Sequence, residues 1–210
     1  MDGVFMKKLW KRMFFLAVIV CCFYTGALLA DKQTLREELI RLHVVADSDS
    51  PEDQAIKLQV RDAVLTSLRE ALADATDMAQ AKAYIREHLP QIQETANAVL
   101  AEIGSGDTAV VTFLEEAFPV RQYDTFSLPS GVYESLRITI GTGEGKNWWC
   151  VVFPSLCFQG TSEDVEDAAV GAGFSDGLSG AVTGKQPYQI RFYFLDLLGR
   201  IENFFFGNKS

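Results

Sequence analysis

Thiol and imidazole groups are the side chains of this chain that could do covalent chemistry, and the sequence has only four cysteines and two histidines. Cys150 and Cys157 lie seven positions apart in the run GKNWWCVVFPSLCF, residues 145–158. Seven extended steps separate two Cα atoms by roughly 23 Å, whereas a disulfide holds them about 4.4–6.8 Å apart. A disulfide therefore requires the chain to reverse between the two cysteines, and Pro154 favours a turn there.

Three interpretations of these groups stay open. A disulfide between Cys150 and Cys157 is predicted if the chain leaves the reducing cytoplasm. Alternatively, both are buried free thiols that pack as small apolar side chains. In a third interpretation Cys150 and His43 form a nucleophile–base pair, which needs only proximity in the folded chain; otherwise His43 bonds neighbouring backbone from a strand.

The loop GTGEGK, residues 141–146, shares its glycines and lysine with phosphate-binding loops. A P-loop has a glycine five positions before its Gly-Lys pair and a serine or threonine after it. Ile140 and Asn147 hold those positions here. We therefore predict a hairpin loop that binds no nucleotide.

The run DSDSPED, residues 47–53, has alternating acidic residues like a calcium loop. Pro51 and Glu52 occupy the positions at which an EF-hand loop needs a ligand and a glycine. We predict a helix cap here, with an isolated calcium contact through Asp47 and Asp49 as the alternative. No catalytic residue, metal site or cofactor is predicted from the sequence.

The first 30 residues have the pattern of an export signal. Basic residues precede an uncharged apolar run, residues 13–30, which ends in small residues that include Ala27 and Ala30. The run is only slightly shorter than the roughly 20 residues that span a bilayer, so an uncleaved membrane anchor is the alternative to a cleaved signal peptide. Because the basic residues come first, the rest of the chain is expected outside the cytoplasm.

The chain beyond this segment is strongly acidic. The whole sequence has a net charge of −9, and residues 1–30 hold four of its basic residues and one acidic residue, which leaves about −12 for the remainder. A surface of this sign repels nucleic-acid phosphates. It also provides no electrostatic attraction to anionic lipid.

Hydrophobic spacing predicts a helical segment after a first strand. The second half of residues 35–46 is apolar and β-branched, as in a strand. Ser50 is a helix N-cap with Pro51 at the first helical position, and apolar residues recur every four positions from Ile56 to Leu72. A second helix is predicted from Thr76 or Asp77, and a third after Pro90 that ends before Gly104 and Gly106.

Short β-branched and aromatic runs then predict strands near residues 108–116, 133–141 and 147–153. The expected fold is α+β, with about three helices packed on a small antiparallel sheet in meander order. The predicted divisions are 1–30, signal peptide or membrane anchor; 31–158, core domain; 159–187, a flexible linker or insertion rich in glycine and acid; and 188–210, a C-terminal amphipathic segment. The last segment could begin as a strand, and its helix either docks on the core or contacts a membrane or partner.

Strand periodicity separates the two tryptophans. Trp148 and Trp149 are adjacent, so their side chains must point to opposite faces of a sheet. Either the strand is covered on both sides, or one indole is exposed beside the glycine-rich loop as a binding hot spot.

Two stretches together resemble a known family. The run LIRLHVVADSDSPEDQAIKLQVRDAVL and the run GKNWWCVVFPSLCF, with FPVRQYDTFSLPSGVYESLRITIG between them, are similar to stage II sporulation protein R of endospore-forming bacteria. The resemblance covers roughly residues 36–158. The sequence departs from the family pattern at Ser155, where a second proline is expected, and residues 159–187 match no family signature.

The resemblance implies a signalling protein rather than an enzyme. Such proteins are made in the forespore and exported into the space between the two septal membranes, secreted or held by an uncleaved N-terminal segment. There they trigger a membrane-embedded aspartic protease that removes the pro-sequence of sigma factor E. The chain has no Asp-Thr/Ser-Gly motif of its own. An exported Cys/His hydrolase or a cell-wall-binding module is the alternative.

The candidate partner-binding residues lie within the two resembling stretches: His43, Asp47, Asp49, Lys146, Asn147, Trp148 and Trp149. The expected partner is the membrane-embedded protease, with no nucleic acid. The signal segment or the C-terminal tail is a candidate for peripheral membrane contact.

Overall fold

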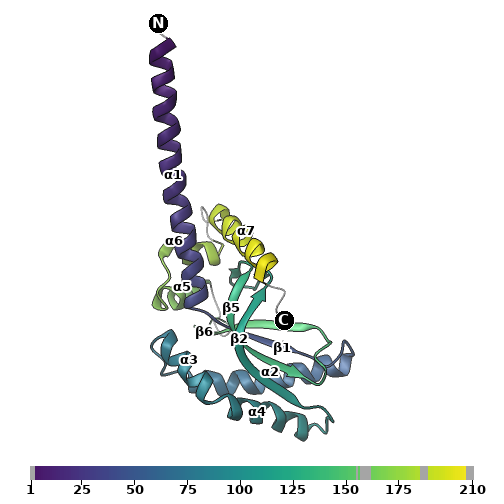
Figure 1. Ribbon diagram of the computed structural model, residues 1–210. Coiled ribbons are helices and arrows are strands. Elements are labelled where there is room, and N and C mark those ends of the chain that lie inside the picture. The colour runs from purple at the N-terminus through teal and green to yellow at the C-terminus, as the bar shows by residue number, and fades with distance from the viewer. Residues whose placement is uncertain (1–2, 155, 157–161, 185–188, 207–210) are drawn as a thin grey trace.

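The computed structural model describes residues 3–154, 156, 162–184 and 189–206, and a four-stranded sheet forms the centre of the body (Figure 1). Helices lie on both faces of this sheet, which confirms the expected α+β class. The elements in chain order are α1 (Gly3–Glu37), β1 (Ile40–Val45), α2 (Pro51–Ala71), α3 (Met78–Glu87), α4 (Leu89–Glu102), β2 (Ala109–Phe118), β3 (Arg121–Gln122), β4 (Ser127–Leu128), β5 (Gly131–Ile140), β6 (Asn147–Phe153), α5 (Ser162–Gly171), α6 (Asp176–Val182) and α7 (Gln189–Phe206).

The strand order is β2-β5-β1-β6, and the sheet is mixed. β1 runs parallel to β5 and antiparallel to β6, and β2 runs antiparallel to β5. The predicted purely antiparallel meander is therefore wrong, and the loop of residues 141–146 connects two strands that flank β1 rather than a hairpin. All six residues of β1 are buried, which suits a central strand, and the chain from β1 to its parallel neighbour β5 contains three helices and β2, which is long enough for parallel pairing.

The helices α2, α3 and α4 cover one face of the sheet, as the spacing predicts (Figure 1). The Ser50 side chain accepts a hydrogen bond from the Asp53 backbone N–H at 3.0 Å, and the Asp77 side chain caps α3 in the same way. Pro90 stands at the start of α4. Apolar side chains from these helices pack on Leu42, Val44 and neighbouring strand residues as the first core.

A second core lies on the opposite face of the sheet, against the end of α1 and against α5, α6 and α7. The segment predicted as a linker contains α5 and α6, and most of their apolar residues are buried. In each helix two buried apolar residues are four positions apart, so they lie on one face that packs on the body. These residues are Val165 and Ala169 in α5, and Leu178 and Val182 in α6. The boundaries of the predicted domains themselves stay a prediction.

The C-terminal segment is helical from Gln189, so the alternative of an initial strand is wrong. Asp196 fixes α7 to the turn before β5, because its carboxylate accepts hydrogen bonds from the Ser130 backbone N–H at 3.0 Å and from the Ser130 hydroxyl at 2.7 Å. Burial raises the pKa of Asp196, but the hydrogen bonds from Ser130 and the guanidinium of Arg200 outweigh it, and the pKa lies below its usual range.

The N-terminal helix α1 projects from the body (Figure 1). It is the one helix among the described residues that is long and apolar enough to cross a membrane, which fits either a signal peptide or an anchor. The helix continues without interruption through Ala27 and Ala30 to Glu37, and Leu28 and Leu35 are buried in the second core.

Candidate functional site: a polar face on the central sheet

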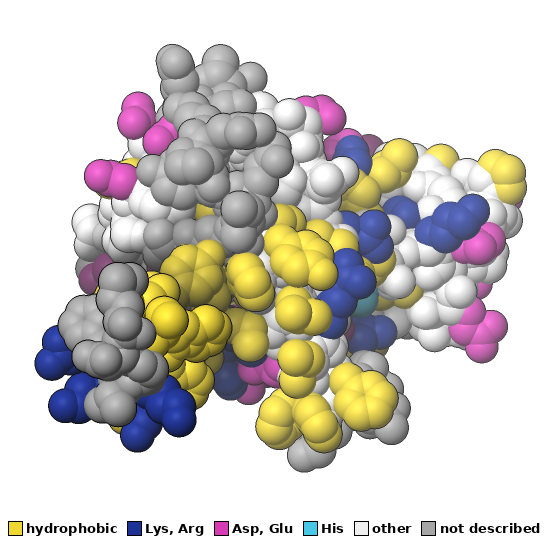
Figure 2. All heavy atoms as spheres, turned by 90° about the horizontal axis from the view of Figure 1, so that it is seen from above, with side chains coloured by type: hydrophobic (Ala, Val, Ile, Leu, Met, Phe, Trp, Pro, Cys, Tyr) yellow, Lys and Arg dark blue, Asp and Glu magenta, His cyan; other side chains and the backbone are white. Residues whose placement is uncertain are grey.

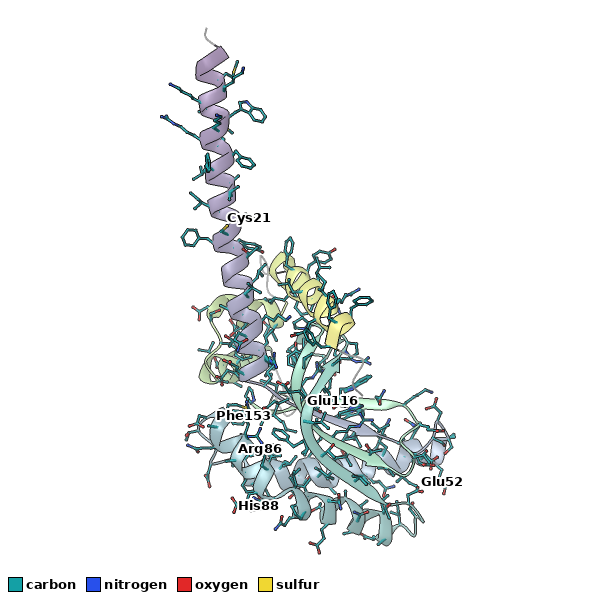
Figure 3. All side chains as sticks on the ribbon, viewed as in Figure 1. Cys21, Glu52, Arg86, His88, Glu116 and Phe153 are labelled. Carbon is teal, nitrogen blue, oxygen red and sulfur yellow. The ribbon has the colours of Figure 1, made fainter. Side chains whose placement is uncertain are left out.

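Polar side chains gather on the face of the sheet opposite α2–α4. Strand alternation places His43 of β1, Glu116 of β2 and Arg137 of β5 on this face, together with Asn147 and Trp149 of β6. We call these five residues the polar sheet face. Figure 3 labels Glu116 near the middle of the body, close to where the strands converge.

Glu116 is the charged centre of the polar sheet face. Its carboxylate is buried, accepts a hydrogen bond from Arg137 Nη1 at 2.8 Å and lies 3.2 Å from His43 Nδ1. Burial alone raises the pKa of a carboxyl group, but the hydrogen bond with His43 and the charge of Arg137 outweigh it, so the pKa of Glu116 lies below its ordinary value. Glu116 is therefore a buried anion that two neighbouring basic side chains stabilise.

Both ring nitrogens of His43 face oxygen acceptors. Nε2 lies 2.8 Å from Asn147 Oδ1, while Nδ1 faces the Glu116 carboxylate, and the ring stacks on Trp149 at 5.5 Å. A protonated imidazole donates to both acceptors. A neutral one satisfies both contacts only if the Asn147 amide turns to present its NH₂ group. His43 thus links the buried carboxylate of Glu116 to the exposed amide of Asn147 at the start of β6.

A buried cation lies beside the polar sheet face, and no carboxylate of the described residues pairs with it. Arg41 has no exposed surface, and its Nη2 donates to the Tyr123 hydroxyl at 2.9 Å. Its guanidinium lies 4.0 Å from the centre of the Phe118 ring, a cation–π contact, while Nε and Nη1 have no hydrogen-bond partner in the part of the chain that the structure describes. Arg121 stacks over Trp149 at 3.6 Å in the same layer.

We expect Arg41→Met to change the free energy of unfolding by less than about 1 kcal/mol, because methionine fills similar space and removes two unpaired buried donors. Arg41→Ala should cost about 3 kcal/mol, since it leaves a cavity. Urea unfolding of the full chain in detergent, followed by circular dichroism, measures both. Equal losses in the two variants would show that the guanidinium charge itself stabilises the fold.

The two tryptophans lie on opposite sides of β6 and are both half-buried. Trp148 packs against the first core, with Arg61 over its ring at 4.8 Å, and Trp149 packs against the second core. The strand is therefore covered on both sides, and neither indole stands out as a freely exposed hot spot.

Asp47, Asp49 and Lys146 connect two loops at one end of the sheet. Asp47 Oδ1 accepts hydrogen bonds from the Thr142 hydroxyl at 2.9 Å and from its backbone N–H at 2.5 Å, and Asp49 Oδ1 accepts one from the Lys146 backbone N–H at 2.8 Å. Lys57 adds a hydrogen bond to the Lys146 carbonyl at 2.9 Å, and burial lowers the pKa of this lysine.

The two carboxylates thus hold the 141–146 loop in place, which argues against the isolated calcium contact. Among the residues that the structure describes, no group of three or more His, Cys, Asp or Glu side chains is arranged to hold a metal ion.

Cys150 and His43 do not meet. Leu42 pairs with Cys150 and His43 pairs with Trp149 across β1 and β6, so the sulfur of Cys150 belongs to the first core while the imidazole lies on the other face. The interpretation of a Cys–His catalytic pair is therefore not supported. Cys157 lies outside the described residues, and the disulfide stays a prediction.

Sequence reasoning missed Glu116, Arg137 and Arg41. A signal for them existed, because Arg41 and His43 alternate with apolar residues in a strand, and Glu116 is followed by Ala117 and Phe118 in a strand. Polar residues repeated on one face of neighbouring strands indicate a polar layer, but only the strand order shows that they come together.

The chain matches the family model of stage II sporulation protein R over residues 36–163, more than half of its length. The chain belongs to this family. A relative from Bacillus subtilis (strain 168), stage II sporulation protein R, is 39% identical over 122 residues, which are 58% of this chain and 54% of that relative. The match thus spans about half the length of the curated relative. No solved structure shows a significant match.

The family match includes every residue of the polar sheet face and the loop contacts of Asp47 and Asp49. It leaves out α6, α7 and most of α1. The part of the chain held in common with the family is therefore the sheet with the helices α2–α4.

Proposed function

We propose that the chain is an exported signalling protein of sporulation that activates a membrane-bound aspartic protease, which then processes the pro-form of sigma factor E. Membership of the stage II sporulation protein R family carries this proposal. The apolar helix α1 supports a route into or across a membrane, from the forespore into the intermembrane space. The separation of Cys150 from His43 gives no support to the alternative of an exported thiol hydrolase.

The proposed contact with the protease lies at the exposed edge of the polar sheet face. Lys146 and Asn147 are exposed at the start of β6, and Asn147 is tied to the buried His43 at 2.8 Å. The network through Glu116 and Arg137 holds this edge rigidly from within. A partner would therefore meet a preorganised polar surface, which reduces the entropy lost on binding.

Co-expression in a non-sporulating host tests the function. The full chain is expressed with the candidate membrane protease and the pro-form of the sigma factor, and processing is followed by the size of the sigma factor on an immunoblot. We expect the mature form only when this chain is present. Equal processing without it would overturn the proposal.

The contact surface has its own test in the same host. The double substitution Lys146→Ala, Asn147→Ala should reduce processing at least about tenfold, as expected when interface contacts worth about 1.4 kcal/mol are lost. Arg86→Ala is the matched control, because Arg86 is also an exposed basic residue but lies on α3, on the face of the sheet that α2, α3 and α4 cover (Figure 3). Normal processing in the presence of the double variant would show that the protease contacts another surface of this chain. The proposed function would still stand.

A further inference from the structure

The helix α7 carries an apolar stripe that the described part of the chain does not cover. Tyr193, Leu197, Ile201 and Phe204 recur at helical spacing and are 65%, 41%, 49% and 81% exposed. Leu195 and Gly199 on the opposite side of the same helix face the body, and the buried pair of Asp196 with Ser130 fixes the helix there. The helix therefore cannot turn its apolar stripe inward without breaking that contact.

This stripe lies beside the helix that could cross a membrane. The rings of Tyr24 in α1 and Phe194 in α7 meet edge to face, with their centres 5.9 Å apart. Seen along α1, hydrophobic side chains of both helices gather on the side of the molecule from which α1 projects (Figure 2). The exposed aromatic residues of α7 thus continue the apolar surface of α1.

We propose that α7 lies in the lipid–water interface of the same bilayer that α1 enters, with its apolar stripe toward the acyl chains. An amphipathic helix with aromatic and aliphatic residues on one face binds a membrane surface in this way. Tyr24 and Tyr193 suit this level, since tyrosine rings are enriched where hydrocarbon meets headgroups.

The charge of the chain defines which lipid is needed. Residues 31–210 carry a net charge of about −12, so the body gains nothing from anionic headgroups. Insertion of α7 must then depend on its apolar area, and a zwitterionic bilayer suffices. The inference does not depend on protease activation, because it concerns lipid alone.

Spin labelling of the full chain in phosphatidylcholine vesicles tests the proposal. Cys21 and Cys22 are replaced by serine, and a single nitroxide is attached through Tyr193→Cys or, in a second protein, Phe204→Cys. Val110→Cys is the matched control, because Val110 is 54% exposed but belongs to β2, an edge strand of the sheet. The parent chain without an introduced cysteine gives the background labelling.

We expect oxygen, which concentrates in lipid, to relax the labels at 193 and 204 more than a water-soluble nickel chelate does, and the reverse at 110. Greater access of the chelate than of oxygen at both α7 positions would overturn the proposal. Spectral broadening at 204 that disappears on dilution with unlabelled chain would also overturn it, in favour of a second copy covering α7.

Discussion

Glu116→Ala is expected to lower the free energy of unfolding by about 3–5 kcal/mol, the cost of leaving a buried charge network without one partner. The substitution removes the acceptor of the 2.8 Å hydrogen bond from Arg137 and leaves Nδ1 of His43 facing a cavity. Urea unfolding of the full chain in detergent, followed by circular dichroism, gives the loss.

Glu115→Ala is the control next in the chain. Glu115 also pairs with an arginine, Arg36, at 2.6 Å, but both side chains are about half exposed. An exposed pair contributes about 0–1 kcal/mol. Similar losses for both variants would mean that burial of Glu116 adds nothing to the stability of the fold.

The pKa of Glu116 gives this prediction a pH dependence. Because the folded-state pKa is lower than the unfolded-state value of about 4.3, the unfolded chain binds more protons in acid. The contribution of Glu116 is therefore complete above pH 4.3 and is lost as the pH falls through the folded-state pKa. The urea midpoint should fall less steeply in acid for Glu116→Gln than for the unsubstituted chain.

Gly199→Ala is expected to release α7 from the body. A Cβ at this position would overlap the carbonyl oxygen of Ser130. Alanine favours a helix over glycine by about 1 kcal/mol, but the overlap is with backbone that cannot move aside, and such overpacking costs about 3 kcal/mol. The net loss is about 2 kcal/mol, so hydrogen–deuterium exchange of the α7 amides should accelerate about 30-fold if that stability is lost locally.

Gly26→Ala provides the control for this glycine. Gly26 also lies within a helix, but among the described residues no atom beyond its chain neighbours and the nearby backbone of its own helix lies within 4 Å of the position of its Cβ. We expect exchange in α7 to stay unchanged in this variant. Unchanged α7 exchange in Gly199→Ala as well would show that the helix does not depend on its close approach to Ser130.

Signals between residues close together in the sequence predicted much of the helices α2, α3 and α4. Ser50 with Pro51 marks the start of α2, and apolar spacing defines the buried sides of α2, α3 and α4. These signals act within a few residues of one another. The helices α5 and α6 were missed because glycine, serine and acidic residues outnumber the few apolar residues that pack, such as Val165 and Leu178.

The strand order could not be predicted in the same way. Hydrophobic alternation identifies a strand and its faces but not its neighbours, and here β1 pairs with β5 and β6, which come about 90 or more residues later in the chain. The candidate site depends on that order. His43 was identified from its type, but its link to Glu116 requires β1, β5 and β2 to lie side by side.

The connection between α1 and β1 is very short. Only Glu38 and Leu39 separate the helix from the central strand, and two residues reach about 7 Å at most. Leu39 is itself fully buried, so this connection cannot extend further. If α1 remains in a bilayer, the sheet cannot swing away from the membrane surface, and its reach toward any receptor is set by the dimensions of the body. Force applied to α1 would pass directly into β1, one of the two inner strands of the sheet.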